Sequence, residues 1–298
     1  MELLQLKYFR ELAQSQHLSK TAEKLHIAQP SLSQTLRRLE TELDTPLFDR
    51  IGKRIVLNDY GKILLKYTNE ILQALDNAVL EIETTKKTEN KTVSLHVYSA
   101  SMLLPALIQT IQNVHPDIRL QIFQQPIAGE HDAPSLYLTS SHLCPDDPDT
   151  ILLMKEPLVA ALPRKHPLAA KKELCLTDLK NEQFVSMSQT SNLFSVIRYY
   201  CSQHQFVPQI TTLADNPSMI RDLLRLNLGI AFIPAYTWQG FASETVVLKP
   251  VYDMPMSRYL LLSWDANRFQ TPAFEQCKEL IIRYFTEYSL QCQSQSEE

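Results

Sequence analysis

Residues 22–34 read AEKLHIAQPSLSQ and predict two short helices joined by a tight turn. Ser19 is the expected N-cap of the first helix, whose inward face carries Ala22 and Leu25. Pro30 suits the first turn of the second helix, because the N–H that proline lacks would have no partner there. The second helix continues with an apolar stripe at helical spacing, formed by Leu32, Leu36, Leu39 and Leu43. The stretch therefore predicts a helix-turn-helix.

The segments on either side complete a small domain over residues 1–60. Upstream, a further helix is indicated by the helical spacing of Leu6, Phe9, Leu12 and Ala13. Downstream, residues 47–57 read LFDRIGKRIVL, two β-prone apolar runs around a basic glycine turn. This pattern predicts a small hairpin, or wing. Together the elements predict a winged helix-turn-helix.

A long linker helix is expected next, over residues 58–91 with its hinge. Asn58 is its N-cap, and no glycine or proline occurs from Lys62 to Leu104. Apolar and small residues alternate at spacings of four and three, as in a coiled-coil seam, at Leu64, Thr68, Ile71, Leu75, Ala78 and Ile82. We predict that Leu64, Ile71, Leu75 and Ile82 form a dimer interface. The polar residues 84–91 predict a hinge into the next domain.

From residue 92 onward, strand-like and helix-like runs alternate. Strands are expected at residues 93–97, 120–123, 158–162, 184–187 and 229–234, and helices at 103–114, 192–204 and 219–226. Such alternation is typical of an α/β fold, here an effector domain of two similar lobes over residues 92–298.

The N-terminal motifs are similar to the signature of the LysR family of transcriptional regulators. The similarity continues through Arg38-Leu39-Glu40, Leu47-Phe48-Asp49-Arg50 and Leu57-Asn58-Asp59-Tyr60-Gly61. It implies a homodimer through the linker helix that pairs into a homotetramer, and two lobes like those of periplasmic binding proteins. The implied lobes are residues 92–162 with 266–298, and residues 163–265, with crossings near Leu162-Pro163 and Trp264-Asp265. Residues 124–136 depart from the family pattern, because two prolines and a glycine replace a full helix.

Polar residues on the exposed face of the second helix match the chemistry of DNA recognition. Glutamine can bond adenine bidentately, arginine favours guanine, and serine bonds several bases. The cations of the wing would hold the backbone or enter the minor groove. We predict DNA binding through Gln29, Pro30, Ser31, Ser33, Gln34, Arg37, Arg38, Arg50, Lys53 and Arg54. The alternative is a solvated face of a small helical domain.

Two hydroxyl-rich segments, residues 99–101 and 186–191, each follow a predicted strand and precede a helix. Ligands of open α/β sheets bind at the carboxyl ends of strands, and helix N-termini favour anions. We therefore predict a cleft for a small polar or anionic effector, contacted by Ser99, Ala100, Ser101, Ser188, Gln189 and Thr190. Ordinary helix capping is the alternative for any one of them.

The remaining composition narrows the function classes. The chain has 298 residues, a net charge of −4 and no GxGxxG, GxSxG or HExxH motif, so neither a catalytic site nor a metal site nor a cofactor is expected. Five scattered cysteines and the absence of an N-terminal signal pattern predict a cytoplasmic protein without a membrane span. The expected partners are double-stranded operator DNA and a small-molecule effector, with RNA polymerase as a further candidate. Two alternatives stay open, a redox-responsive regulator acting through Cys201 and a two-lobed binding protein without a regulatory role.

Overall fold

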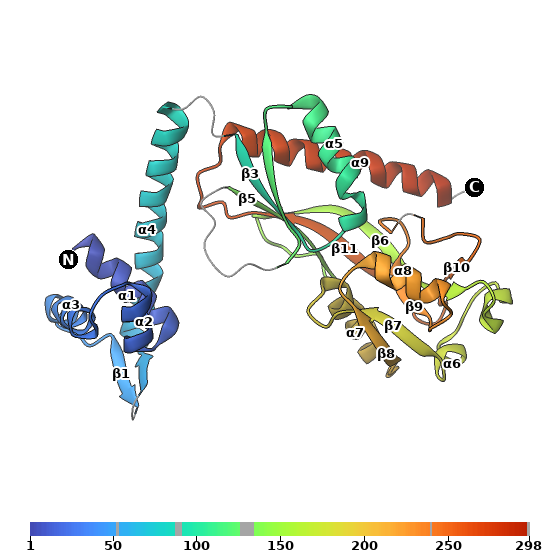
Figure 1. Ribbon diagram of the computed structural model, residues 1–298, viewed down its shortest axis with the longest axis horizontal. Coiled ribbons are helices and arrows are strands. Elements are labelled where there is room, and N and C mark those ends of the chain that lie inside the picture. Colours follow the sequence, from blue (N-terminus) through green and yellow to red (C-terminus); the bar gives the residue numbers. More distant parts are fainter. Residues whose placement is uncertain (52–53, 87–90, 126–133, 239, 297–298) are drawn as a thin grey trace. The chain divides into compact units, whose positions relative to one another are not determined.

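The computed structural model describes residues 1–51, 54–86, 91–125, 134–238 and 240–296 (Figure 1). The chain divides into two compact units. The first holds residues 1–88 with the short segment 267–269, and the second holds residues 89–266 and 270–298.

The N-terminal unit is the predicted winged helix-turn-helix followed by a long helix. Its elements are α1 (Leu3–Ser15), α2 (Leu18–Lys24), α3 (Gln29–Glu42), β1 (Phe48–Ile51), β2 (Arg54–Leu57) and α4 (Asp59–Lys86). Strands β1 and β2 pair antiparallel, with Phe48 opposite Leu57. The core joins all of the helices to the wing, and the ring of Phe9 on α1 meets that of Phe48 edge to face at 5.7 Å.

Helix boundaries in this unit confirm one predicted cap and correct two details. Asn58 caps α4, since its Oδ1 accepts a hydrogen bond of 2.9 Å from the Gly61 N–H. Ser19 is not a cap, because α2 begins at Leu18 with His17 as the preceding residue. Leu43 does not extend the buried stripe of α3, since the helix ends at Glu42 and Leu43 is 38% exposed.

Gly61, in the first turn of α4, lies directly against the segment that leads into the wing. A Cβ atom at this position would collide with the carbonyl oxygen of Leu47 and with the Leu57 side chain. The absence of a side chain at Gly61 therefore permits close packing of α4 against the hairpin.

The second unit is built on one long mixed sheet. Its strands are β3 (Thr92–Val97), β4 (Arg119–Phe123), β5 (Ser135–Ser141), β6 (Thr150–Pro163), β9 (Ala231–Pro234), β10 (Val246–Lys249) and β11 (Met256–Ser263). The order is β10-β6-β11-β5-β3-β4, with β9 also paired to β6. Strand β3 is parallel to β4 and β5, whereas β11 runs antiparallel to β5 and β6.

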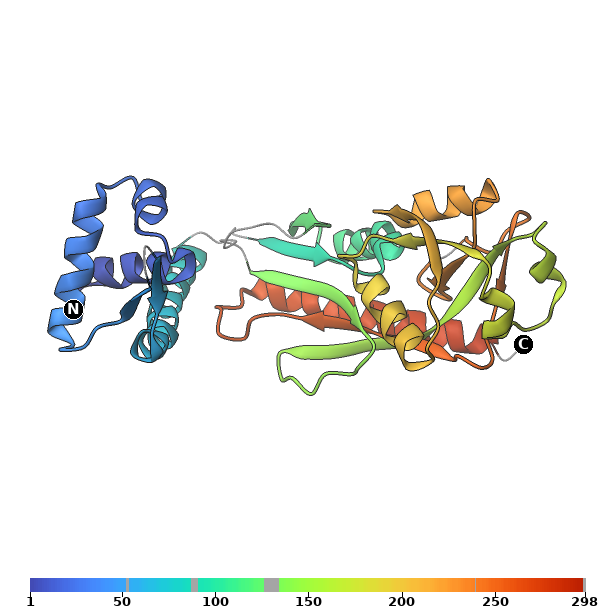
Figure 2. The same ribbon diagram turned by 90° about the horizontal axis from the view of Figure 1, so that it is seen from below.

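Helices cover this sheet and complete a second layer. Helix α5 (Leu104–Val114) follows the short turn η1 (Ser101–Leu103) and packs with the C-terminal helix α9 (Pro272–Ser296). Figure 2 shows α9, in red, running along much of the unit. The other half contains η2 (Pro167–Ala170), α6 (Leu176–Leu179), α7 (Asn192–Gln203) and α8 (Pro217–Arg225) around the parallel pair of β7 (Gln183–Met187) and β8 (Gln209–Ala214).

Two hydrophobic cores define two lobes, and their boundary differs from the predicted one. Lobe I takes core residues up to Met154 and from Leu260 onward, whereas lobe II takes core residues from Leu158 to Met256. The chain therefore passes between lobes inside β6 and inside β11, earlier than the predicted crossings at 162–163 and 264–265. Because each strand continues unbroken through the boundary, no turn residue marks it in the sequence.

Candidate DNA-binding surface and effector site

Helix α3 presents a polar face opposite its buried stripe. Leu32 and Leu39 are at most 1% exposed. The DNA-contact residues predicted on this helix are exposed, except for the half-buried Ser33, and comprise Gln29, Pro30, Ser31, Gln34, Arg37 and Arg38. Pro30 lies in the first turn, as predicted. The structure thus places these side chains along one accessible surface.

Local hydrogen bonds organise the start of α3. Ser19 on α2 donates to Oε1 of Gln29 at 3.0 Å, which ties the two helices together across the turn. Among the ion pairs of the described residues, none involves Arg37 or Arg38, so neither guanidinium is neutralised by a neighbouring carboxylate. Both cations are available to phosphate oxygens.

The wing brings two of the three predicted cations onto neighbouring strands. Arg50 lies opposite Ile55, and Arg54 lies opposite Ile51, in the β1–β2 register. Lys53 and the side chains of Arg50 and Arg54 lie outside the described part of the structure.

Helix α4 has an inner and an outer face, and the predicted dimer seam divides between them. Leu64 is half-buried against the core of its own unit, and Thr68 and Leu72 are buried. Leu64 therefore packs partly against the core of its own unit, whereas the prediction placed it in the dimer seam. The outer face exposes large apolar side chains at Ile63, Tyr67, Ile71, Leu75, Val79 and Ile82.

A cavity of about 540 Å³ lies between the two lobes. Five of the six predicted effector residues line it, namely Ser99, Ala100, Ser101, Ser188 and Thr190. The sixth, Gln189, is exposed and is absent from the lining. Further lining residues were not predicted, among them Tyr98, Gln124, Gln125, Asn192, Asp215, Trp238 and Arg258. Residues 126–133, most of the segment that departs from the family pattern, lie outside the described part of the chain.

Two helices of lobe II begin at the cavity. Ser191 caps α7 by accepting a hydrogen bond of 3.1 Å from the Phe194 N–H, and Asn216 caps α8 by accepting one of 2.9 Å from the Met219 N–H. Both caps line the cavity. The partial positive charge at the N-terminus of each helix makes this wall favourable for an anion.

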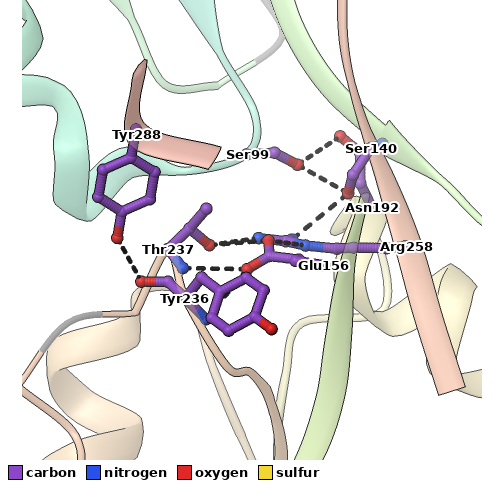
Figure 3. A network of polar contacts seen from close by, with 8 residues as sticks. All are labelled: Ser99, Ser140, Glu156, Asn192, Tyr236, Thr237, Arg258 and Tyr288. Carbon is purple, nitrogen blue, oxygen red and sulfur yellow. Dashed lines mark hydrogen bonds and ion pairs between the residues drawn. The ribbon is translucent and has the colours of Figure 1, made fainter. Parts of the chain in front are cut away.

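In lobe I, Ser99 bonds to other side chains instead of capping a helix. Its hydroxyl lies 2.9 Å from Oγ of Ser140 on β5 and 3.5 Å from Oδ1 of Asn192 at the start of α7 (Figure 3). Ser99 therefore links the lobes across one side of the cavity.

A buried ion pair lies beside this link. Arg258 on β11 donates from Nε to Oε1 of Glu156 on β6 at 2.7 Å, and the two residues are 2% and 0% exposed (Figure 3). The sequence carries a signal for this pair, since each residue is a charge inside an otherwise largely apolar strand. Buried charges are rarely tolerated without a partner, but the sequence does not show which partner each one finds.

Both units of the chain match known protein families. Residues 3–62 match the bacterial regulatory helix-turn-helix protein of the lysR family, and residues 90–286 match the LysR substrate binding domain. The transcriptional regulator YybE of Bacillus subtilis (strain 168) is 30% identical over 299 residues, which cover 96% of this chain and 100% of YybE. The chain belongs to the LysR family. It is a DNA-binding transcriptional regulator with an effector-binding domain.

A second relative and a solved structure are also similar to this LysR-type regulator. The hca operon transcriptional activator HcaR of Escherichia coli (strain K12) is 30% identical over 278 residues, covering 91% of this chain and 94% of HcaR. Full-length OxyR from Pseudomonas aeruginosa shares the fold with a TM-score of 0.55, at 22% identity and 94% coverage of both chains. The curated relatives of this chain, HcaR and GltC among them, are transcriptional regulators. The LysR-type regulator is accordingly not an enzyme.

The cysteines of the LysR-type regulator do not favour the redox alternative. Cys201 is 4% exposed on α7, and burial raises the pKa of its thiol to about 11. The reactive thiolate is therefore scarce at neutral pH.

The exposed Cys144 and the neighbouring His142, whose ring stacks on Tyr199 at 3.8 Å, belong to no metal-binding cluster among the described residues. Nor does any described helix combine the length and hydrophobicity that crossing a bilayer requires.

Proposed function

We propose that this LysR-type regulator binds a small, polar, anionic effector in the cavity between its lobes and reads operator DNA with α3. In this proposal two copies pair through the outer face of α4, with Ile71, Leu75 and Ile82 in the interface, and the wing residues Arg50, Lys53 and Arg54 contact the DNA backbone. Two dimers form a homotetramer that acts in the cytoplasm and contacts RNA polymerase.

The proposed effector site rests on one observation: the two walls of the cavity belong to different lobes. Ser99, Ala100 and Ser101 come from lobe I, whereas Ser188 and Thr190 come from lobe II. A ligand that touches both walls has different contacts when the lobes move relative to each other. It therefore favours one lobe arrangement by its differential affinity.

The lining also indicates the character of the ligand. Hydroxyl and amide groups and the starts of α7 and α8 supply donors for a polar, anionic part. Met187, Leu193 and Trp238 supply an apolar surface for the remainder. Such a combination of a few polar groups and apolar walls is usual for small-molecule sites.

The test obstructs the cavity with one large side chain. Thr190→Trp places an indole at a lining position, and Gln189→Trp places the same group at the exposed neighbour outside the lining. Operators are first recovered by sequencing DNA bound by the parent protein. A reporter behind such an operator is then measured with and without the filtered small-molecule fraction of a cell extract.

We expect Thr190→Trp to abolish the response of the reporter while effector-free DNA affinity stays unchanged. Gln189→Trp should keep both properties. A full response from Thr190→Trp would show that the effector binds elsewhere.

A further inference from the structure

The Glu156–Arg258 pair occupies the point at which the chain passes between lobes. The two residues are direct partners in the antiparallel register of β6 and β11. The cores change from lobe I to lobe II between Met154 and Leu158 on β6, and between Leu260 and Met256 on β11. Any group that binds this pair therefore acts on both crossing strands.

Glu156 is fully occupied by protein donors. Its oxygens accept hydrogen bonds from Nε of Arg258 at 2.7 Å, from the N–H and the hydroxyl of Thr237 at 2.9 Å each, and from the N–H of Tyr236 at 3.3 Å. Two carboxylate oxygens offer about four acceptor positions, and four donors fill them. Glu156 is 0% exposed and is absent from the cavity lining. Its role is to hold the guanidinium in place.

Arg258 still has capacity for a ligand. A guanidinium carries about five N–H donors. Nε binds Glu156, and Nη2 binds the Thr237 hydroxyl at 2.8 Å. Among the residues that the structure describes, Nη1 reaches only the Ser140 hydroxyl, at the long distance of 3.4 Å. Arg258 lines the cavity, and Figure 3 shows its guanidinium beside the group of Ser99, Ser140 and Asn192.

We infer that Arg258 binds the acidic group of the effector and that this group is a carboxylate. The planar fork of arginine matches the planar carboxylate, and hydrogen bonds between charged partners are the stronger ones. Glu156 already neutralises part of the cation, and Asp215 also lines the cavity, so a singly charged group fits better than a phosphate. Ser99 and Asn192 stand next to the guanidinium to complete the site.

This inference rests on the proposed effector cavity and adds a residue and a ligand class to it. Removing Arg258 alone would leave the Glu156 carboxylate buried without its cation, which is strongly destabilising. The test variant is therefore Glu156→Gln with Arg258→Gln, which removes both charges together and keeps hydrogen-bonding groups. Arg258→Lys is the second variant, because it keeps the charge opposite Glu156 and loses the planar fork.

The experiment uses the full chain and three carboxylates paired with their amides. Formate, acetate and benzoate are compared with formamide, acetamide and benzamide at constant ionic strength. Thermal unfolding and calorimetry measure binding. We expect at least one carboxylate and none of the amides to stabilise the parent protein. The double variant and Arg258→Lys should each bind that carboxylate about tenfold or more weakly, with circular dichroism like that of the parent.

The outcomes separate this inference from the proposed function. The inference is overturned if no carboxylate binds the parent, if an amide binds as well as its acid, or if a folded variant binds the carboxylate with parental affinity. In the same assay Thr190→Trp should lose carboxylate binding. If amides bind the parent and lose affinity in Thr190→Trp, the cavity is the effector site and Arg258 is not its anion-binding residue.

Discussion

At the scale of single residues, neighbouring side chains of α3 alternate between the domain core and the exposed surface. Leu32 is buried, whereas Ser31 and Gln34 are exposed. The exposed side chains can reach base edges only because the leucines fix the rotation of the helix about its axis. Glutamine both donates and accepts, so Gln34 can distinguish adenine from other bases.

Gln34→Ala is expected to cost about 1–3 kcal/mol of binding free energy on the cognate operator and little on random DNA. The reason is that a bidentate contact with a base is lost while phosphate contacts remain. Fluorescence anisotropy with both DNAs measures the two losses. Gln14→Ala, an exposed glutamine on α1, is the matched control and should change neither affinity. Equal losses on both DNAs would reject base reading by Gln34.

At the scale of elements, α4 carries two apolar faces with different partners. Leu72 is 2% exposed within its own unit, whereas Leu75, three residues later, is 37% exposed. The sequence pattern of spacings of four and three does not separate these faces, because both are apolar. The packing of α1 against α4 decides which face is inward.

The two faces predict opposite consequences for two leucine variants. Leu72→Ala should lower the free energy of unfolding by about 2–5 kcal/mol, because it opens a cavity in the core, and should leave the folded protein dimeric. Leu75→Glu should leave the unfolding of the monomer nearly unchanged and weaken the dimer, because a charge would be buried at the interface. Urea unfolding and sedimentation at low concentration check the pair. A Leu75→Glu protein as dimeric as the parent would show that the interface lies elsewhere.

At the scale of the whole molecule, the excess negative charge lies outside the DNA-binding domain. The chain carries −4, yet residues 1–60 hold nine Lys/Arg and eight Asp/Glu, so the negative charge belongs to the rest. We therefore expect DNA affinity to depend on a few local cations and not on the overall charge.

This distribution is checked by the salt dependence of DNA binding. Arg54→Ala is expected to weaken binding to cognate and random DNA alike and to lower the slope of log affinity against log salt by about one, because one phosphate contact disappears. Lys172→Ala removes an exposed cation from the effector-binding unit and should leave the slope unchanged. If both variants changed the slope equally, the whole-molecule field would matter more than the wing.

Sequence alone determined the elements whose information is local. Residues 22–34, the basic hairpin, the cap at Asn58 and the alternation of strands and helices after residue 92 all follow from periodicity and turn chemistry. Hydroxyl-rich segments after strands also pointed to five of the cavity residues, because strand ends and helix starts can be recognised one at a time.

Only the tertiary structure decided what depends on pairing between distant segments. It packed Leu64 against the domain core, placed the lobe boundary inside β6 and β11, and joined Glu156 to Arg258, 102 residues further along the chain. A strand pattern shows that a charge will be buried, but the register between β6 and β11 chooses its partner. The pair lies where the chain passes between the lobes, and of its two residues only Arg258 lines the cavity.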